Sequence, residues 1–134
     1  LKYVNTMATA TLPQLAIAEF LEHGGYDHYL RKTRALYAQG IERMTHAVAR
    51  YFPDGTRVTQ PAGGFVLWVE LPKKVDAFEL HRRALARKIS IAPGPLFSPK
   101  QTYRNCIRLT CALPWDERLD RALVTLGRLA GELA

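Results

Sequence analysis

The stretch Asn105-Cys-Ile-Arg-Leu-Thr110 places one arginine inside an otherwise apolar strand. Arginine stays charged in proteins, so the guanidinium of Arg108 needs either an anion or open water at its tip. A planar guanidinium binds a carboxylate through two parallel hydrogen bonds. We therefore predict that Arg108 binds the carboxylate of a small molecule such as an amino acid. The alternative is an arginine that only reaches solvent or pairs with an acid on a helix.

Around this strand, the pattern from residue 57 onward predicts the order strand, strand, helix, strand, strand, helix. Residues 65–71 are apolar on both faces, which is typical of a central strand. Asp76 and Glu79 predict a capped helix, and its expected inner stripe contains Ala77, Leu80, Ala84 and Leu85. Residues 89–92 predict a short strand that ends in a rigid Pro93-Gly94-Pro95 loop, and a last helix is expected from about residue 115.

Two helices are expected before this sheet. Thr11-Leu-Pro-Gln14 has a capping-box pattern, and the helix that begins there is apolar almost all round, which predicts burial against another domain or subunit. A second, long helix is expected over about 27–52. The predicted fold class is therefore α/β, in a two-layer α+β arrangement with the helices on one side of a small sheet. Residues 1–56 are expected to link or brace, and 57–134 to form the sheet-and-helix core of one structural domain.

Four further residues are candidates for the wall or hinge of a pocket. Gly63 and Gly64 precede the central strand, where the absence of a side chain allows close approach to a ligand or a hinge. Pro93 and Gly94 lie in the predicted rigid loop. Ordinary turns are the alternative for both pairs. The sequence has no convincing serine–histidine–acid set, no metal-ligand cluster and no glycine-rich phosphate loop before a helix. An isolated enzyme is therefore not expected.

Charge and composition leave a nucleic-acid partner as a minor alternative. The chain has 134 residues and a net charge of +7, but its basic residues are spread over several amphipathic helices, which indicates solvated faces. Cys106 and Cys111 are separated by an odd number of positions on one strand, so they should face opposite ways as small buried residues in a reducing cytoplasm. No apolar run approaches the roughly 20 residues that a membrane span needs.

Several segments together resemble the carboxy-terminal small domain of fold-type I aminotransferases, which use pyridoxal 5′-phosphate. These segments are Pro61-Ala-Gly-Gly-Phe-Val-Leu-Trp68, Val75-Asp76, Ile89-Ser-Ile-Ala-Pro-Gly94, Leu96-Phe-Ser98 and Asn105-Cys-Ile-Arg-Leu109. The linking helices of the same family are similar to Leu12-Pro-Gln14 and Gly25-Tyr-Asp-His-Tyr-Leu-Arg-Lys-Thr-Arg34. More narrowly, the chain resembles the MocR-type branch of GntR transcription regulators, which join a winged-helix DNA-binding domain to an aminotransferase-like domain.

This resemblance implies that Arg108 binds the α-carboxylate of an amino-acid substrate or effector. It also implies that the Schiff-base lysine and the rest of the pyridoxal phosphate site belong to an upstream large domain, so this chain alone should not be active. DNA binding through a separate domain, a homodimeric parent and an amino acid or amine ligand are implied in the same way. A genuine class I/II aminotransferase and a stand-alone small-molecule-sensing module are the alternatives.

Overall fold

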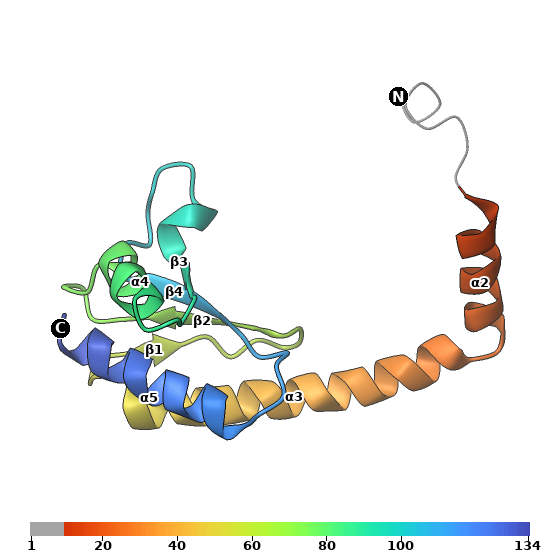
Figure 1. The fold of residues 1–134 in the computed structure, drawn as a ribbon, viewed down its shortest axis with the longest axis horizontal. Helices are drawn as coiled ribbons and strands as arrows, with labels where there is room; N and C mark the ends of the chain where they lie inside the picture. Colours follow the sequence, from red (N-terminus) through yellow and green to blue (C-terminus); the bar gives the residue numbers. More distant parts are fainter. Residues whose placement is uncertain (1–9) are drawn as a thin grey trace. The chain divides into compact units, whose positions relative to one another are not determined.

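The structure is a computed structural model, which describes residues 10–134 (Figure 1). Within these residues two helices come first, two strands follow, and helices and strands then alternate. The elements are α2 Thr11–Glu22, α3 Gly25–Tyr51, β1 Arg57–Val58, β2 Val66–Glu70, α4 Ala77–Leu85, β3 Ala92–Pro93, the 3-10 helix η1 Gly94–Phe97, β4 Cys106–Thr110 and α5 Glu117–Gly131. The predicted order of strands and helices after residue 57 is confirmed, with η1 as an addition.

The strands form one antiparallel sheet in the order β1-β2-β4-β3. The strand β2 is therefore an interior strand, as its apolar faces predicted. In the register of the sheet, Arg108 lies opposite Trp68 of β2 on one side and opposite Ala92 of β3 on the other. Residues that lie directly opposite in a ladder share one face of the sheet. Arg108 and Trp68 consequently project from the same face.

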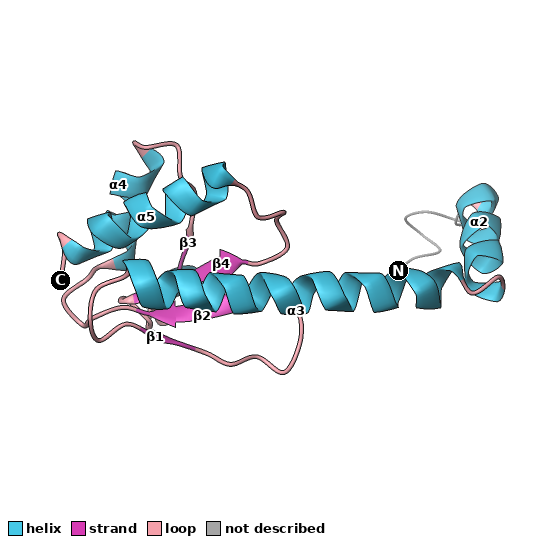
Figure 2. Cartoon of the chain, turned by 90° about the horizontal axis from the view of Figure 1, so that it is seen from below, coloured by secondary structure: helices cyan, strands magenta, loops and turns pink. Residues whose placement is uncertain are grey.

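The hydrophobic core lies on the other face of the sheet, against α3, α4 and α5 (Figures 1 and 2). The strands contribute side chains that are almost completely buried, including Leu67 and Val69 from β2 and Ile107 from β4. Helix contributions include Met44, Val48, Leu80, Ala84, Leu123 and Leu126. The predicted arrangement of a small sheet with helices on one side is confirmed.

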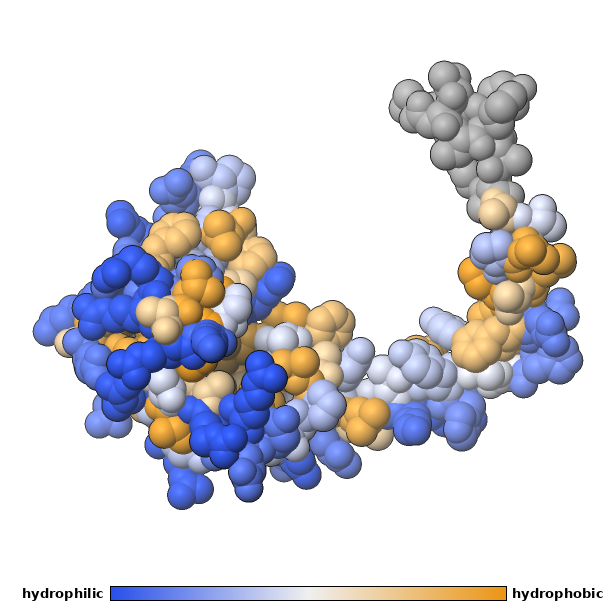
Figure 3. All heavy atoms as spheres, viewed as in Figure 1, coloured by the Kyte–Doolittle hydropathy of each residue, from blue (hydrophilic) through white to orange (hydrophobic). Residues whose placement is uncertain are grey.

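The chain divides into two compact units, residues 1–35 and 36–134. The second part of α3 belongs to the same unit as the sheet, and its side chains Met44, Ala47 and Val48 are buried in the core. In α2 no residue is buried, and Figure 3 shows apolar side chains on its surface. The boundary predicted between residues 56 and 57 rests on the roles expected of the two segments, namely bracing and forming the sheet-and-helix core, and it stays a prediction.

The capping box predicted at Thr11 is wrong. Thr11 is the first residue of α2, Ala10 occupies the capping position, and no side-chain hydrogen bond caps the helix. The cap predicted for α4 is confirmed, because the carboxylate of Asp76 accepts hydrogen bonds from the backbone N–H groups of Phe78 and Glu79. Leu85 was wrongly placed in the inner stripe of α4. It is 56% exposed, since each residue turns a helix by about 100° and Leu85 lies one step beyond the buried Ala84.

The strand predicted at 89–92 begins later and is shorter than expected. Lys88 adopts a left-handed conformation with φ of 62°. The N–H of Lys88 donates to the carbonyl of Leu85, and that of Ile89 to the carbonyl of Ala84. This pair of bonds is a Schellman motif, which ends a helix and reverses the chain. Ile89 therefore belongs to the turn that ends α4, and Pro93, predicted in the loop, belongs to β3.

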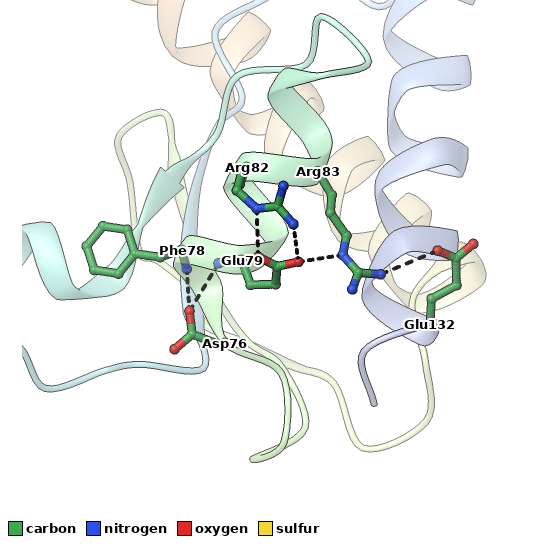
Figure 4. A network of polar contacts seen from close by, with 6 residues as sticks. All are labelled: Asp76, Phe78, Glu79, Arg82, Arg83 and Glu132. Carbon is green, nitrogen blue, oxygen red and sulfur yellow. Dashed lines mark hydrogen bonds and ion pairs between the residues drawn. The ribbon is translucent and has the colours of Figure 1, made fainter.

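A polar network joins α4 to α5 (Figure 4). The carboxylate of Glu79 accepts hydrogen bonds from Arg82 and Arg83 at 2.8 Å. Arg83 also lies 3.9 Å from a carboxylate oxygen of Glu132, at the end of α5. These side chains lie at the surface, so the network adds little to the burial that holds the two helices. Among residues 10–134, no helix has the length and apolarity that crossing a bilayer requires.

Candidate functional site

Arg108 lies in the middle of β4, on the face of the sheet that is opposite the core. Its neighbours Ile107 and Leu109 are buried, whereas Arg108 itself is exposed. This alternation arises from the period of two in a strand, which sends successive side chains to opposite faces. The guanidinium is therefore presented on an open face by a strand whose other face is fixed in the core.

Three aromatic side chains contact one another beside this position, and one of them, Phe97, contacts Arg108; we call Trp68, Phe97 and Tyr103 the aromatic cluster. The Cζ atom of Arg108 lies 4.3 Å from the centre of the Phe97 ring. The ring of Phe97 meets Trp68 edge to face at 5.8 Å, and Trp68 meets Tyr103 edge to face at 5.4 Å. None of the three was predicted from the sequence to be a site residue. The register of β2 against β4 places Trp68 on the face of Arg108, and nothing local in the sequence indicates Phe97 or Tyr103.

The guanidinium of Arg108 forms no ion pair and donates no side-chain hydrogen bond within residues 10–134, so the helix-acid alternative is not seen there. Other arginines of this part of the chain do pair with carboxylates, namely Arg57, Arg82, Arg83, Arg104, Arg121 and Arg128. A permanently charged group whose hydrogen-bonding edge is open is suited to an anionic ligand.

The four pocket or hinge candidates fall in two places. Pro93 pairs with the core residue Ile107 and is buried, so it lies on the face of the sheet opposite the side chain of Arg108. A Cβ atom on Gly94 would lie 2.5 Å from the carbonyl oxygen of Tyr103, so glycine there permits a close approach of two backbone segments. Gly63 and Gly64 lie before β2, where an added Cβ would meet nothing within 4 Å. Gly64 has a φ of 88°, which suits a turn that favours glycine. A role in a pocket or hinge stays a prediction for all four.

A cavity of about 290 Å³ borders the site on the side of α3 and α5. Its lining is mostly apolar and includes Met44, Leu119 and Leu123, while Arg108 is the charged member and Ser90 and Thr110 are polar. The aromatic cluster does not line this cavity. Arg108 thus lies between this mostly apolar cavity and the aromatic cluster.

The cysteines and histidines do not form a reactive or metal-binding group in the described chain. Cys106 and Cys111 are buried and unbonded to each other, as predicted. Burial raises the pKa of the Cys111 thiol to about 11. Burial, with a smaller effect of the Glu70 charge, also raises the pKa of Cys106. Both thiols are therefore protonated at neutral pH and poor nucleophiles. Across residues 10–134, no group of three or more His, Cys, Asp or Glu side chains is placed to hold a metal ion.

Comparison with known proteins identifies the family. The chain matches the family described as aminotransferase class I and II over residues 2–126. It is 37% identical over 127 residues to the HTH-type transcriptional regulator YjiR of Escherichia coli, which covers 95% of this chain and 27% of that protein. It is 35% identical over 127 residues to the 2-aminoadipate transaminase of Thermus thermophilus, covering 94% of this chain and 32% of the transaminase.

A solved structure agrees with these relatives. The α-aminoadipate aminotransferase LysN of Thermus thermophilus, complexed with N-(5′-phosphopyridoxyl)-L-leucine, matches with a TM-score of 0.86 and 32% identity over 98% of this chain and 34% of that one. The chain therefore spans about a third or less of the length of these relatives. Its sheet and helices correspond to the carboxy-terminal small domain of fold-type I aminotransferases, so the resemblance drawn from the sequence is confirmed. This chain is an aminotransferase-like domain and belongs to the aminotransferase class I and II family.

Proposed function

We propose that this chain is the small domain of a larger transcription regulator of the GntR/MocR type, in which Arg108 binds the carboxylate of an amino-acid effector. The observation that carries the proposal is the open guanidinium of Arg108, exposed on β4 and without an ion pair within residues 10–134. Identities of 37% to YjiR and 36% to YdcR, both HTH-type regulators of Escherichia coli, over 95% and 98% of the chain support the regulator assignment.

The described residues fit the ligand side of such a site and not the cofactor side. A phosphate is usually held by backbone N–H groups at the start of a helix or in a glycine-rich loop. Gly63 and Gly64 lead into β2 rather than into a helix. Gly94 precedes Pro95, which has no N–H to donate, in a short 3-10 helix. Pyridoxal phosphate, together with its lysine, would therefore be held by a large domain outside this chain.

Arg108 would act by binding and orienting the ligand. A bidentate grip fixes both the position and the rotation of a carboxylate, and so directs the rest of the amino acid. When bound, pyridoxal phosphate supplies an electron sink for bonds at the carbon that carries the amino group. In a regulator, we expect the gripped ligand to favour one arrangement of the domains and so to change DNA binding through a separate winged-helix domain. A homodimer is part of the same proposal.

The second candidate is a working aminotransferase. It is favoured by the 35% identity to 2-aminoadipate transaminase over 94% of the chain. In that case Arg108 would still bind the carboxylate, and the same pair of hydrogen bonds would orient the substrate for turnover. The two candidates differ only in the step after ligand binding. Turnover of an amino acid and a keto acid by the full-length protein would favour the enzyme, whereas ligand-dependent binding to its own promoter DNA would favour the regulator.

The substitution Arg108→Ala tests the role of the arginine. In the full-length protein loaded with pyridoxal phosphate, we expect Arg108→Ala to weaken the binding of L-leucine by roughly 10- to 100-fold. Hydrogen bonds between charged groups are worth about 1.5–3 kcal/mol, which corresponds to this loss of affinity. The binding of 3-methylbutylamine, which has the same side chain but no carboxylate, should change little. Titration followed by the visible absorbance of the cofactor measures both ligands.

Arg104→Ala is the matched control for this experiment. Arg104 is also an exposed arginine near the site strand, but it pairs with Asp76 at 3.5 Å. Its loss removes the same positive charge without removing the open guanidinium, so both ligands should bind as in the wild type. Equal losses for L-leucine and the amine in Arg108→Ala would contradict the proposed function. Peptide mapping after borohydride reduction would show whether the cofactor is attached to a lysine upstream of this chain.

A further inference from the structure

The guanidinium of Arg108 is held against one ring of the aromatic cluster. Its Cζ atom lies 4.3 Å from the centroid of Phe97, well within the distance at which a cation is attracted to the face of an aromatic ring. Phe97 ends the 3-10 helix η1, which comes directly after strand β3. The contact therefore joins two segments that are not adjacent in the sequence.

The ring of Phe97 is itself held in place. Trp68 contacts it at 5.8 Å with the planes at 72°, and Tyr103 supports Trp68 at 5.4 Å with the planes at 86°. In the same 3-10 helix, Gly94 and Pro95 are buried, and the N–H of Ser98 donates to the carbonyl of Pro95 at 3.2 Å. Both the backbone and the ring of Phe97 are thus supported by neighbouring residues.

This cation–π contact does not use the hydrogen-bonding capacity of the arginine. The N–H groups of a guanidinium are its donors, and Arg108 donates none of them to another side chain within residues 10–134, so they remain available to a ligand while Cζ lies over the ring. The arginine side chain has many rotamers, and restricting them before a ligand arrives reduces the entropy that binding must overcome. Phe97 thus restricts Arg108 while leaving its hydrogen-bonding edge open.

We infer that Phe97 is a positioning residue, which holds the guanidinium of Arg108 in the orientation that receives a carboxylate. The inference rests on the proposed function, because it assigns Phe97 a role through Arg108. Trp68 and Tyr103 support the ring of Phe97. The role depends on an aromatic face at position 97 and not on apolar volume alone.

The test uses the full-length protein and the pair L-leucine and 3-methylbutylamine. Phe97→Leu keeps an apolar side chain but removes the ring. We expect this substitution to weaken the binding of L-leucine by roughly 3- to 10-fold, and to change the affinity for the amine by less than about 2-fold. Phe97→Tyr retains the ring face and should restore the affinity for L-leucine. Phe78→Leu is the matched control, since Phe78 is 43% exposed and Phe97 is 42% exposed, and it should leave both affinities unchanged.

A second measurement requires no substitution and no ligand. In NMR spectra of the 134-residue chain, the Nε–H proton of Arg108 should be shifted upfield by the ring current of Phe97, and the shift should disappear in Phe97→Leu. A normal chemical shift and free motion of this group in the wild type would overturn the inference.

The outcomes separate the inference from the proposed function. If Arg108→Ala loses carboxylate affinity but Phe97→Leu does not, the role of Phe97 is overturned and the proposed function stands. If Arg108→Ala shows no preference between the two ligands, the proposed function fails, and the inference fails with it. Equal weakening of L-leucine and the amine in Phe97→Leu would indicate a merely structural ring and would also overturn the inference.

Discussion

At the scale of single residues, the site depends on one charged side chain and on a glycine that lets two segments meet. Arg108 is exposed because the buried Ile107 and Leu109 hold the other face of β4 in the core. Gly94 lies so close to the Tyr103 segment that a Cβ atom would come within 2.5 Å of the Tyr103 carbonyl and 2.9 Å of the Cys106 carbonyl. Both contacts are with backbone atoms, which cannot move aside as a flexible side chain can.

Gly94→Ala should therefore destabilise the fold. We expect a loss of about 1–3 kcal/mol in the free energy of unfolding, the usual cost of overpacking in a buried place. Chemical denaturation of the 134-residue chain measures it. The matched control is Gly63→Ala, where an added Cβ would meet nothing within 4 Å, so its stability should stay near that of the wild type. Equal stability of the two variants would show that the Tyr103 segment moves away easily.

At the scale of elements, α4 is defined by local signals at both ends. Asp76 caps its first turn through two hydrogen bonds, and the Schellman motif at Lys88 ends it. Between them, hydrogen bonds from Arg82 and Arg83, in that order of importance, lower the pKa of Glu79 from its ordinary value of 4.5 to about 2 (Figure 4). Because the network lies at the surface, it gives the stability of the domain a small dependence on acid.

The pKa of Glu79 is lower in the folded chain than in the unfolded one. The ionised network therefore stabilises the fold above about pH 4.5, and this contribution is lost as the pH falls through about 2. We expect the free energy of unfolding of the wild type to fall more steeply over this range than that of Glu79→Gln. NMR titration of the Glu79 carboxyl group gives the pKa directly.

Glu117→Gln is the control for the acid dependence. Glu117 pairs with Arg121 at the exposed start of α5, so its replacement removes one acid and leaves the Glu79 network intact. Its stability should therefore fall at low pH as steeply as in the wild type. Parallel curves for the wild type and Glu79→Gln would contradict the assignment, because the network would then contribute nothing that depends on pH.

At the scale of the whole molecule, burial is unequal between the two compact units. Residues 36–134 enclose the core between the sheet and the helices, whereas α2 has no buried residue and exposes Leu12, Leu15 and Ile17. Exposed apolar surface of this extent is consistent with the expectation that α2 is covered in a larger protein. What covers it stays a prediction.

Hydrogen exchange of the 134-residue chain should reflect this division. Amides of β4 and of α5 should exchange slowly, close to the rate of global unfolding, because their backbone bonds open only when the core opens. Amides of α2 should exchange many-fold faster, since few buried contacts resist their opening. Exchange measured at several protein concentrations is the control. Equally slow exchange in α2 at low concentration would contradict the prediction.

Much of the fold was predictable because its signals are local. The apolar neighbours of Arg108 predicted a strand around it, and Asp76 was recognisable as a helix cap from its neighbours alone. The errors arose where local signals compete. A non-glycine residue, Lys88, ends α4 in a left-handed conformation, so the strand after it begins at Ala92 and not at Ile89. At α2, the chain begins the helix at Thr11 without using its hydroxyl as a cap.

By itself, then, the sequence determined the order of the elements, the central place of the strand that contains Trp68 and the presence of one arginine in an otherwise apolar strand. These properties depend on residues that are neighbours along the chain, so a period of two or of 3.6 is enough to reveal them. Only the tertiary structure decided that Phe97 lies over Arg108 and that Gly94 lies against Tyr103. Such contacts join distant segments, and they depend on strand register and on the path of a loop, which no local pattern specifies.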